Sequence, residues 1–256
     1  MRKKNKTNID MQEAPKRMWS IDPDSGELCV DIPSVAEKCS VFIATPTYGR
    51  VTAQYTSSLA RTVLYLTNCK IKNEWSFHMG CSVIDLARNM MVADFLKSKM
   101  THMLFIDDDL DWDHRAVVRM LAMDLPIYGG TYSKKGMDDM AHVACGNGKR
   151  MFGCTEAWSL PTGFMLIKRE VIEDMIQKRP DLKFKFFGDD ETDKYTYRFF
   201  QSTIHPVTGE WLGEDYFFCE LAKSLGYEVW VDMIHKIEHI GSVAFKHNIA
   251  KRVKFK

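Results

Sequence analysis

The sequence predicts an α/β fold with a mixed, mostly parallel central sheet flanked by helices. Within the first 130 residues, short apolar runs alternate three times with longer segments of helical periodicity. Polar residues follow several of the apolar runs, at the strand ends where open α/β sheets bind ligands. The chain has 256 residues, which is enough for one large domain of this class or two small ones.

The first half supplies most of the regular pattern. Short apolar runs predict four strands, at 41–44, 75–79, 103–106 and 127–130. Apolar residues at helical spacing predict helices at 52–66 and 81–98. A third helix carries Val117, Val118 and Leu121, and either Asp111 or Asp113 is expected to cap it.

The second half is less regular. Residues 131–158 resemble a long loop with short strands, and residues 179–212 mix aromatic residues, acids and turn signals. Between and after these segments the pattern predicts strands at 164–167 and 228–231 and helices at 169–178 and 214–225, the last ended by Gly226.

We expect one domain with an extension at each end. Residues 1–38 form an N-terminal extension with a turn at 22–26 between two short strands. Residues 39–241 form the domain, with a regular half at 39–130, whose strand–helix alternation is typical of nucleotide-binding sheets, and a less regular half at 131–241. Residues 242–256 form a basic tail, which is either solvated or a weak tether to an anionic surface.

Composition excludes several classes of protein. With a net charge of +1, the protein has no overall positive potential that would attract it to nucleic acid or to an anionic membrane. No stretch of 18 apolar residues predicts a membrane-spanning helix, and the first 20 residues lack the apolar core of a secretory signal. The seven cysteines contain no CxxC pair, which argues against a thiolate zinc site and a disulfide scaffold. We therefore expect a cytoplasmic protein with reduced cysteines.

Three consecutive acids follow the strand at 103–106. Side chains alternate in an extended chain, so Asp107 and Asp109 should share a face while Asp108 points away. Two carboxylates on one face suit a hard cation such as Mg²⁺ or Mn²⁺ that also takes phosphate oxygens. The alternative is a solvated acidic loop that caps the following helix.

Two later positions could complete a site. Glu214 and Asp215 begin a predicted helix, where the helix dipole alone would favour acids, but a carboxylate there could also be a general base. His239 could be a third metal ligand, with His235 as the competing candidate. A single histidine is more often structural.

Basic residues could meet a phosphate. Arg88 lies on an otherwise apolar helix and could form a forked contact with a phosphate or carboxylate, although a solvated helix face explains it nearly as well. Lys134 and Lys135 could meet a leaving diphosphate or could be ordinary exposed lysines.

The order of these elements is more specific than any one of them. TPTYGR, ARN, FIDDD, GGTYSKK, PTGFMLIKRE, GEDYFFCELAKSLGY and HIG follow one another along residues 39–241. In this order the chain resembles the GT-A-fold nucleotide-sugar glycosyltransferases, which have a Rossmann-like fold. It is most similar to the small stand-alone, family 2-like enzymes of bacteria and large DNA viruses.

The resemblance implies roles by position. Asp109 would be the stronger metal ligand, Asp107 would lie nearer the ribose, and His239 would complete the metal site. Asp215 would be the base, preceded by Glu214. The remaining positions would contact the nucleotide, its diphosphate or the donor sugar: Thr45, Pro46, Thr47, Tyr48, Arg88, Asp108, Lys134 and Gly163. Residues 1–38 and 179–212 match nothing specific.

The implied activity is metal-dependent transfer of a sugar, with inversion, from a UDP- or GDP-sugar to an acceptor hydroxyl, with Mn²⁺ or Mg²⁺. The acceptor could be a glycan or another hydroxyl compound, including a modified nucleic acid, and the oligomeric state is open. A sugar-1-phosphate nucleotidyltransferase would also use paired acids and Mg²⁺, but usually carries a glycine-rich basic loop that TPTYGR matches poorly. A non-catalytic sugar-binding module is the third alternative.

Overall fold

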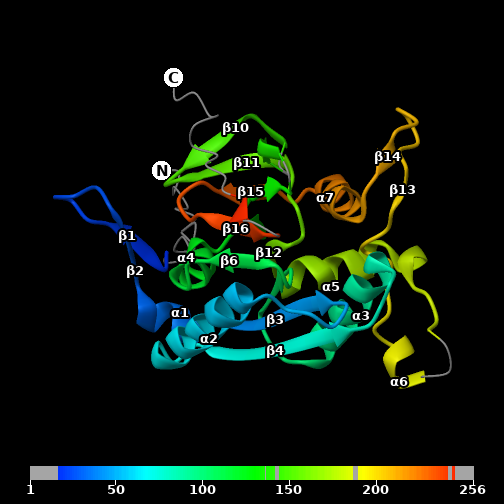
Figure 1. The fold of residues 1–256 in the computed structure, drawn as a ribbon, viewed down its shortest axis with the longest axis horizontal. Coiled ribbons are helices and arrows are strands. Elements are labelled where there is room, and N and C mark those ends of the chain that lie inside the picture. The colour runs from blue at the N-terminus through cyan, green and yellow to red at the C-terminus, as the bar shows by residue number, and fades with distance from the viewer. Residues whose placement is uncertain (1–16, 136, 142–143, 187–189, 242–243, 246–256) are drawn as a thin grey trace, which may run out of the picture.

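The computed structural model describes residues 17–135, 137–141, 144–186, 190–241 and 244–245. Its centre is an eight-stranded sheet with the strand order β10-β11-β15-β7-β12-β5-β3-β4 (Figure 1). In that order the strands are Ala144–Met151, Cys154–Ser159, Val229–Asp232, Ile127–Gly129, Phe164–Lys168, His102–Ile106, Ser40–Thr47 and Lys72–Met79. The α/β class is confirmed, and the sheet is mixed, in a single Rossmann-like domain.

The strand directions differ in detail from the expected parallel majority. Strand β3 runs parallel to β4 and β5, and β15 runs parallel to β7. Strand β12 is antiparallel to both of its neighbours, β5 and β7, and the β10–β11 hairpin adds two further antiparallel pairs. An apolar run is compatible with either direction, so the sequence pattern could not reveal this.

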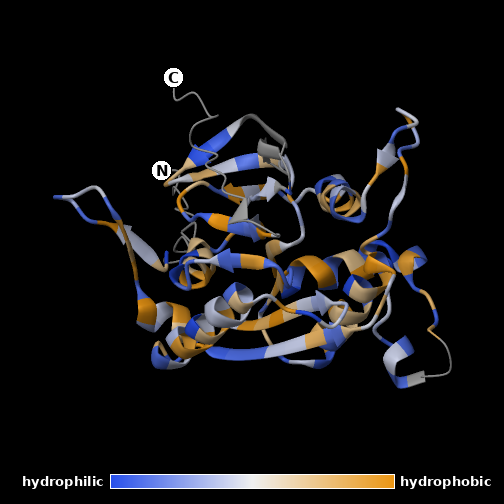
Figure 2. Ribbon diagram, viewed as in Figure 1, coloured by the Kyte–Doolittle hydropathy of each residue, from blue (hydrophilic) through white to orange (hydrophobic). Residues whose placement is uncertain are grey.

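The central strands are buried on both faces, as their apolar runs predict. Leu104 and Ile106 of β5 belong to one hydrophobic cluster, whereas Met103 and Phe105 belong to the other. The first cluster includes residues of α2 (Ala53–Asn68) and α4 (Arg115–Met123), and the second includes residues of α3 (Ile84–Lys97), α5 (Arg169–Lys178) and α7 (Glu214–Ser224). The fold is therefore a sheet between two helical layers, and Figure 2 shows the apolar residues of β3 beside the more hydrophilic edge strand β4.

Local signals explain several helix boundaries. The hydroxyl of Thr52 accepts a hydrogen bond from the backbone N–H of Tyr55 and caps α2. Gly226, at φ +94°, follows α7 in the left-handed region that glycine adopts without strain. The predicted helices at 52–66, 169–178 and 214–225 are confirmed.

Two predictions were wrong. Neither Asp111 nor Asp113 is the N-cap of α4, which is His114. Asp111 lies in strand β6 (Leu110–Trp112), which pairs with β16 (Ile237–Ile240), whereas Oδ1 of Asp113 accepts a hydrogen bond from the backbone N–H of Arg115 at the start of α4. Residues 131–158 are not mainly loop: they include β8 (Ser133–Lys134), β9 (Met137–Ala141) and the long β10–β11 hairpin. Glycine and charged residues at 146–150 conceal the strand alternation there.

The remaining elements lie around the sheet. Strands β1 (Trp19–Ile21) and β2 (Leu28–Val30) flank the predicted turn at 22–26 and lead to α1 (Ile32–Lys38). Residues 179–212 contain a 3₁₀ turn (Pro180–Leu182), α6 (Asp190–Asp193), β13 (Thr203–Ile204) and β14 (Trp211–Leu212). Strand β17 (Ala244–Phe245) pairs with β16.

Residues 1–16 and 246–256, which carry the basic ends of the chain, lie outside the described residues. Within the described part, no helix combines the length and the apolar character needed to cross a bilayer.

Candidate functional site

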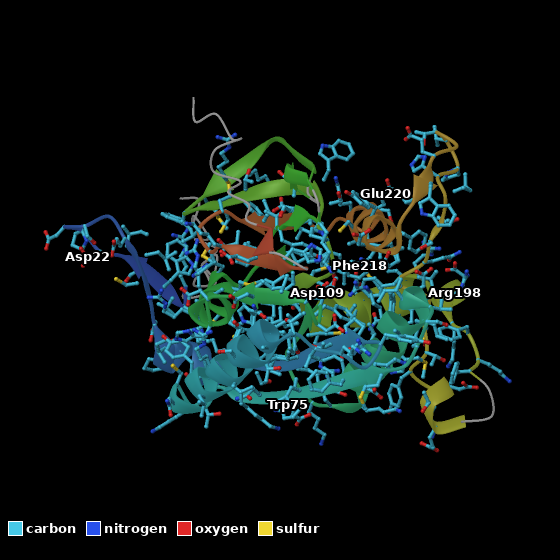
Figure 3. The ribbon with its side chains drawn as sticks, in the orientation of Figure 1. Asp22, Trp75, Asp109, Arg198, Phe218 and Glu220 are labelled. Atoms are coloured by element: carbon cyan, nitrogen blue, oxygen red, sulfur yellow. The ribbon has the colours of Figure 1, made fainter. Side chains whose placement is uncertain are left out.

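Eight of the predicted site residues meet where the carboxyl ends of β3 and β5 lie side by side, whereas Gly163, Glu214 and Asp215 do not line the cavity found there. A cavity of about 420 Å³ opens there. It is lined by the end of β3, the start of α3, the acids that follow β5 and one residue of β16: Pro46, Thr47, Tyr48, Arg88, Asp107, Asp108, Asp109 and His239, with five others. Asp109 lies toward the middle of the molecule (Figure 3). Parallel strands explain this convergence, because their carboxyl ends share one edge of the sheet.

Arg88 connects the two halves of the site. Its side chain is almost fully buried, and its Nη2 donates to Oδ1 of Asp107 over 3.2 Å. Its Nε donates to Oε1 of Glu214, also over 3.2 Å. The acids after β5 are thereby tied to the start of α7. The sequence predicted that Arg88 would face a phosphate or carboxylate, and in this structure its partners are two carboxylates.

One nitrogen of Arg88 is left over. Nη1 is buried and has no hydrogen-bond partner among the described residues. A buried cationic donor without a partner is costly, so its presence beside the cavity needs an explanation. An anionic ligand in the cavity would supply the missing acceptor.

Gly163 lies where a larger residue would not fit. A Cβ atom built on it would lie 2.0 Å from the Tyr132 hydroxyl oxygen and 2.5 Å from Oδ2 of Asp107. Its carbonyl also accepts a hydrogen bond from the backbone N–H of Asp107. Tyr132 was not predicted as a site residue, and its only signal is its place between two glycines and two lysines in GGTYSKK. Its buried ring makes an edge contact with the ring of His239, with centroids 5.1 Å apart.

The three acids take different partners. The chain turns after Ile106, with the N–H of Leu110 donating to the carbonyl of Asp107, so the strand alternation does not continue through the acids. Asp108 was predicted to point away, but it lines the same cavity as its neighbours. Burial raises the pKa of Asp108, and a hydrogen bond from Thr47 opposes that shift.

Asp109 is the acid that meets His239. Its Oδ2 lies 3.3 Å from Nε2 of His239 and also contacts the ammonium group of Lys135. Burial alone would raise the pKa of Asp109, but His239 and Lys135 outweigh it and the pKa is lowered. Lys135 was one of two lysines considered for a diphosphate; the side chain of the other, Lys134, is not among those described.

His235 is separated from this site. Its Nδ1 lies 2.9 Å from Oδ2 of Asp232, and it lines a different cavity together with Arg119 and the β1–β2 hairpin. Of the two histidines, His239 is therefore the one that could share a cation with Asp109.

The orientation of His239 suits a metal ligand. A carbonyl oxygen can only accept, so Nδ1, which lies 2.9 Å from the carbonyl of Ser133, carries the proton. In the neutral ring Nε2 then presents a lone pair to Asp109, which is the second-sphere arrangement typical of metal-bound histidine. Two acceptors facing each other over 3.3 Å require a proton or a cation between or beside them.

No group of three His, Cys, Asp or Glu side chains in the described part of the chain is arranged to hold a metal. Asp107, the third predicted ligand, is bound to Arg88. Asp109 and His239 could hold a cation only together with water and phosphate oxygens at its other positions. Cations at nucleotides commonly take one or two protein carboxylates and complete their shell in this way.

Asp215 has the properties of a general base. Burial, followed by the charge of Glu214, raises the pKa of Asp215 to about 6. Its Oδ1 accepts a hydrogen bond from the backbone N–H of Tyr216 over 2.8 Å, which fixes the carboxylate at the start of α7. A carboxylate with a pKa near 6 can accept a proton at neutral pH better than an ordinary surface aspartate.

Of the four residues predicted to contact the nucleoside at the end of β3, three line the cavity and one does not. Pro46, Thr47 and Tyr48 line the cavity, and Tyr48 is exposed. Thr45 is buried and its hydroxyl is bonded to that of Tyr55, so it supports the loop from behind.

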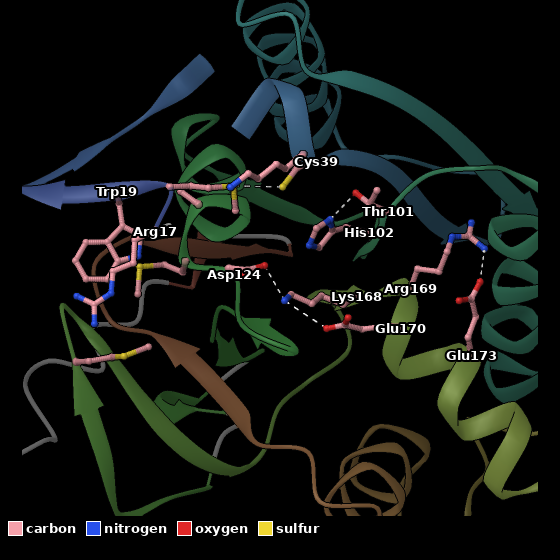
Figure 4. A pocket seen from close by; sticks show the side chains of 15 residues that line it. Arg17, Trp19, Cys39, Thr101, His102, Asp124, Lys168, Arg169, Glu170 and Glu173 are labelled. Atoms are coloured by element: carbon pink, nitrogen blue, oxygen red, sulfur yellow. Dashed lines mark hydrogen bonds and ion pairs between the residues drawn. The ribbon is translucent and has the colours of Figure 1, made fainter. Parts of the chain in front are cut away.

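A larger cavity, of about 760 Å³, lies at the opposite end of β5 around His102 (Figure 4). Lys168 there is paired with Asp124 and Glu170. Burial lowers the pKa of His102 to about 4, so this histidine is neutral at physiological pH. The cavity also has three acids, but Asp124 and Glu170 are paired with Lys168, and Glu173 is paired with Arg169.

No family model and no curated protein matches the chain. Among solved structures, it is similar to a glycosyltransferase involved in glycosylation of the major capsid of PBCV-1, with 12% identity, 76% of this chain and 94% of that chain covered, and a TM-score of 0.33. It is also similar to a protein assigned as a glucose-1-phosphate thymidylyltransferase from Bacillus anthracis, with 10% identity, 75% and 89% covered, and a TM-score of 0.36. At these TM-scores neither likeness supports an argument about activity, so the function has to be inferred from the site.

Proposed function

We propose that the protein is a glycosyltransferase that moves a sugar from a nucleoside diphosphate sugar to an acceptor hydroxyl. The observation that carries the proposal is the pair of contacts from buried Arg88 to Asp107 and Glu214. These contacts link the acids proposed for the donor side to the helix start that bears Asp215. In this proposal residues 39–130 supply the nucleotide side and residues 131–241 the acceptor side.

On the donor side, Pro46, Thr47 and Tyr48 would hold the nucleoside, and the unpartnered Nη1 of Arg88 would donate to the donor. Gly163 would support the donor side indirectly, because the missing side chain lets Tyr132 and the Asp107 carboxylate pack against its backbone. Asp109 and His239 would hold Mn²⁺ or Mg²⁺, which when bound supplies positive charge beside the departing diphosphate.

On the acceptor side, Asp215 would take the proton from the attacking hydroxyl. The new bond joins the acceptor oxygen to the anomeric carbon as the bond from that carbon to the diphosphate oxygen breaks. Attack from the face opposite the diphosphate would invert the anomer, through an oxocarbenium-like state.

The pKa of Asp215 also bears on the alternative. A nucleotidyltransferase joins a sugar phosphate to a nucleotide, and its nucleophile is already ionised at neutral pH. A neutral acceptor hydroxyl needs a proton removed, which is the role that the proposal gives to Asp215, whose pKa burial raises to about 6. Product analysis separates the two reactions.

The test is a thermal-shift screen of UDP-, GDP-, CMP- and dTDP-sugars with and without Mn²⁺, followed by product analysis with the donor that binds. A specific donor at a hundredfold excess over its Kd should stabilise the protein by about 2.7 kcal/mol. Release of a nucleoside diphosphate supports glycosyl transfer. Pyrophosphate release from a nucleoside triphosphate and a sugar phosphate would instead identify a nucleotidyltransferase, and binding without turnover would identify a sugar-binding module.

A further inference from the structure

We infer that Lys135 competes with the divalent cation for Asp109 and that a bound diphosphate relieves this competition. The contact that motivates the inference joins the ammonium group of Lys135 to Oδ2 of Asp109. That same oxygen faces Nε2 of His239. The ammonium group of Lys135 therefore already contacts the oxygen of Asp109 to which a divalent metal ion would bind.

The charges around Asp109 explain why Lys135 occupies this place. Asp107 is paired with Arg88, which it shares with Glu214, and Asp108 is hydrogen-bonded to the hydroxyl of Thr47, whereas Asp109 is the acid whose side chain contacts Lys135. The same Oδ2 of Asp109 lies 3.3 Å from Nε2 of His239 and contacts the ammonium group of Lys135, so a cation arriving at this oxygen meets both side chains.

The lysine is placed so that it can leave. Its side chain is 46% exposed, whereas that of Asp109 is 23% exposed, so moving the ammonium group outward costs little burial. Lys135 lies in the turn between β8 and β9, one residue beyond the end of β8. Exposed pairs of this kind contribute about 0.2–1 kcal/mol, which a dication can readily outweigh once it has further ligands.

A diphosphate would supply those ligands and a second partner for the lysine. Without the diphosphate, a divalent metal ion that binds Asp109 and His239 must displace the ammonium group of Lys135. That positive group then remains close to the positive metal ion, which is unfavourable. With the diphosphate present, Lys135 can pair with phosphate oxygens instead. Cation and diphosphate should consequently strengthen each other's binding, and the coupling must be reciprocal.

The inference relies on the proposed function only in taking Asp109 and His239 as the ligands of the cation. Its test is calorimetric titration of Mn²⁺ into the full chain at pH 7.5, with and without saturating UDP, and needs no turnover. Four proteins are compared: the unmodified chain, Lys135→Met, Asp109→Asn and Lys99→Met. Lys99 is an exposed lysine before β5, at the opposite end of that strand from the acids, so its variant controls for the loss of one positive charge.

Without UDP, Lys135→Met should bind Mn²⁺ about threefold more tightly than the unmodified chain, which corresponds to about 0.7 kcal/mol. Lys99→Met should match the unmodified chain, and Asp109→Asn should lose binding. UDP should tighten Mn²⁺ binding by a larger factor in the unmodified chain than in Lys135→Met. Only the unmodified chain has a lysine at position 135 that UDP can draw away from Asp109.

Three results would overturn the inference: unchanged or weaker Mn²⁺ binding by Lys135→Met, equal tightening by Lys99→Met, or an equal effect of UDP in both proteins. If the titrations give the expected results but the protein transfers no sugar, the inference about Lys135 stands and the proposed function is wrong. Unchanged melting temperatures of the variants without metal would show that the fold is intact.

Discussion

Nε of Arg88 donates to Oε1 of Glu214 over 3.2 Å, although 126 residues separate the two in the sequence. The same guanidinium group binds Asp107 through Nη2. A planar fork can serve two carboxylates at once, which a lysine ammonium group cannot do with the same geometry. Arg88 therefore fixes the distance between the acids after β5 and the start of α7.

Replacing Arg88 should be costly in a way that depends on the substitute. Arg88→Met leaves two largely buried carboxylates without their cation and should lower the free energy of unfolding by about 3 kcal/mol. Arg88→Lys should recover part of that loss. Urea unfolding of both variants checks this, and equal stability of Arg88→Met and the unmodified chain would show that the contacts do not hold the site together.

Gly163 should tolerate no side chain. Gly163→Ala would place a methyl group against the Tyr132 hydroxyl and the Asp107 carboxylate, and overpacking of this kind costs about 1–3 kcal/mol. The double variant Gly163→Ala, Tyr132→Phe removes the nearest oxygen and should regain part of the stability. If the stability losses of the two single variants, measured by thermal unfolding, add up to the loss of the double variant, the predicted contact between residues 163 and 132 would be contradicted.

Asn89 should be needed to hold residue 200. Its amide donates to the carbonyl of Phe200 over 2.8 Å and accepts from the N–H of Phe200 over 3.0 Å. Asn89→Ala leaves both buried backbone groups without partners and should cost about 2–3 kcal/mol. Asn89→Asp keeps the acceptor and loses the donor, so urea unfolding should rank its stability lower than that of the unmodified chain.

The pKa of Asp215 predicts how stability varies with pH. Folding raises that pKa from 3.8 to about 6, so the folded chain holds this proton more tightly than the unfolded chain. Stability from this group is fully present below pH 3.8 and is lost as the pH rises to about 6. Asp215→Asn should therefore raise the melting temperature relative to the unmodified chain at pH 7.5 more than at pH 4.5. If Asp215→Asn raises the melting temperature equally at pH 4.5 and pH 7.5, burial does not destabilise the charged form of Asp215.

Much of the fold was predictable because its strong signals are local. The run at 103–106 is buried on both faces, and Gly226 ends α7 as expected. Strand direction was not predictable, since the antiparallel placement of β12 depends on which strands it meets. The β10–β11 hairpin was missed because its partner is β15, more than 70 residues later in the chain.

For the candidate site, residue types and their order indicated Asp109, His239 and Asp215, and the structure brings Asp109 and His239 within 3.3 Å of each other. The roles of all three stay predictions, and their partners depend on the fold. The sequence could not show that Arg88 would bind Asp107 and Glu214, nor that Tyr132 would be buried beside Gly163. Asp108 was misplaced because strand alternation was extended into a turn.

The central claim is that Asp215 removes the proton from the acceptor in a sugar transfer. The most direct measurement is the rate of nucleoside diphosphate release by the unmodified chain and by Asp215→Asn, with the donor identified by thermal shift and its acceptor, from pH 5 to 8. The account predicts that the unmodified rate falls below pH about 6. It also predicts that Asp215→Asn lowers the rate by about 10²–10⁴-fold while donor binding is retained. Transfer by Asp215→Asn at close to the unmodified rate would contradict it.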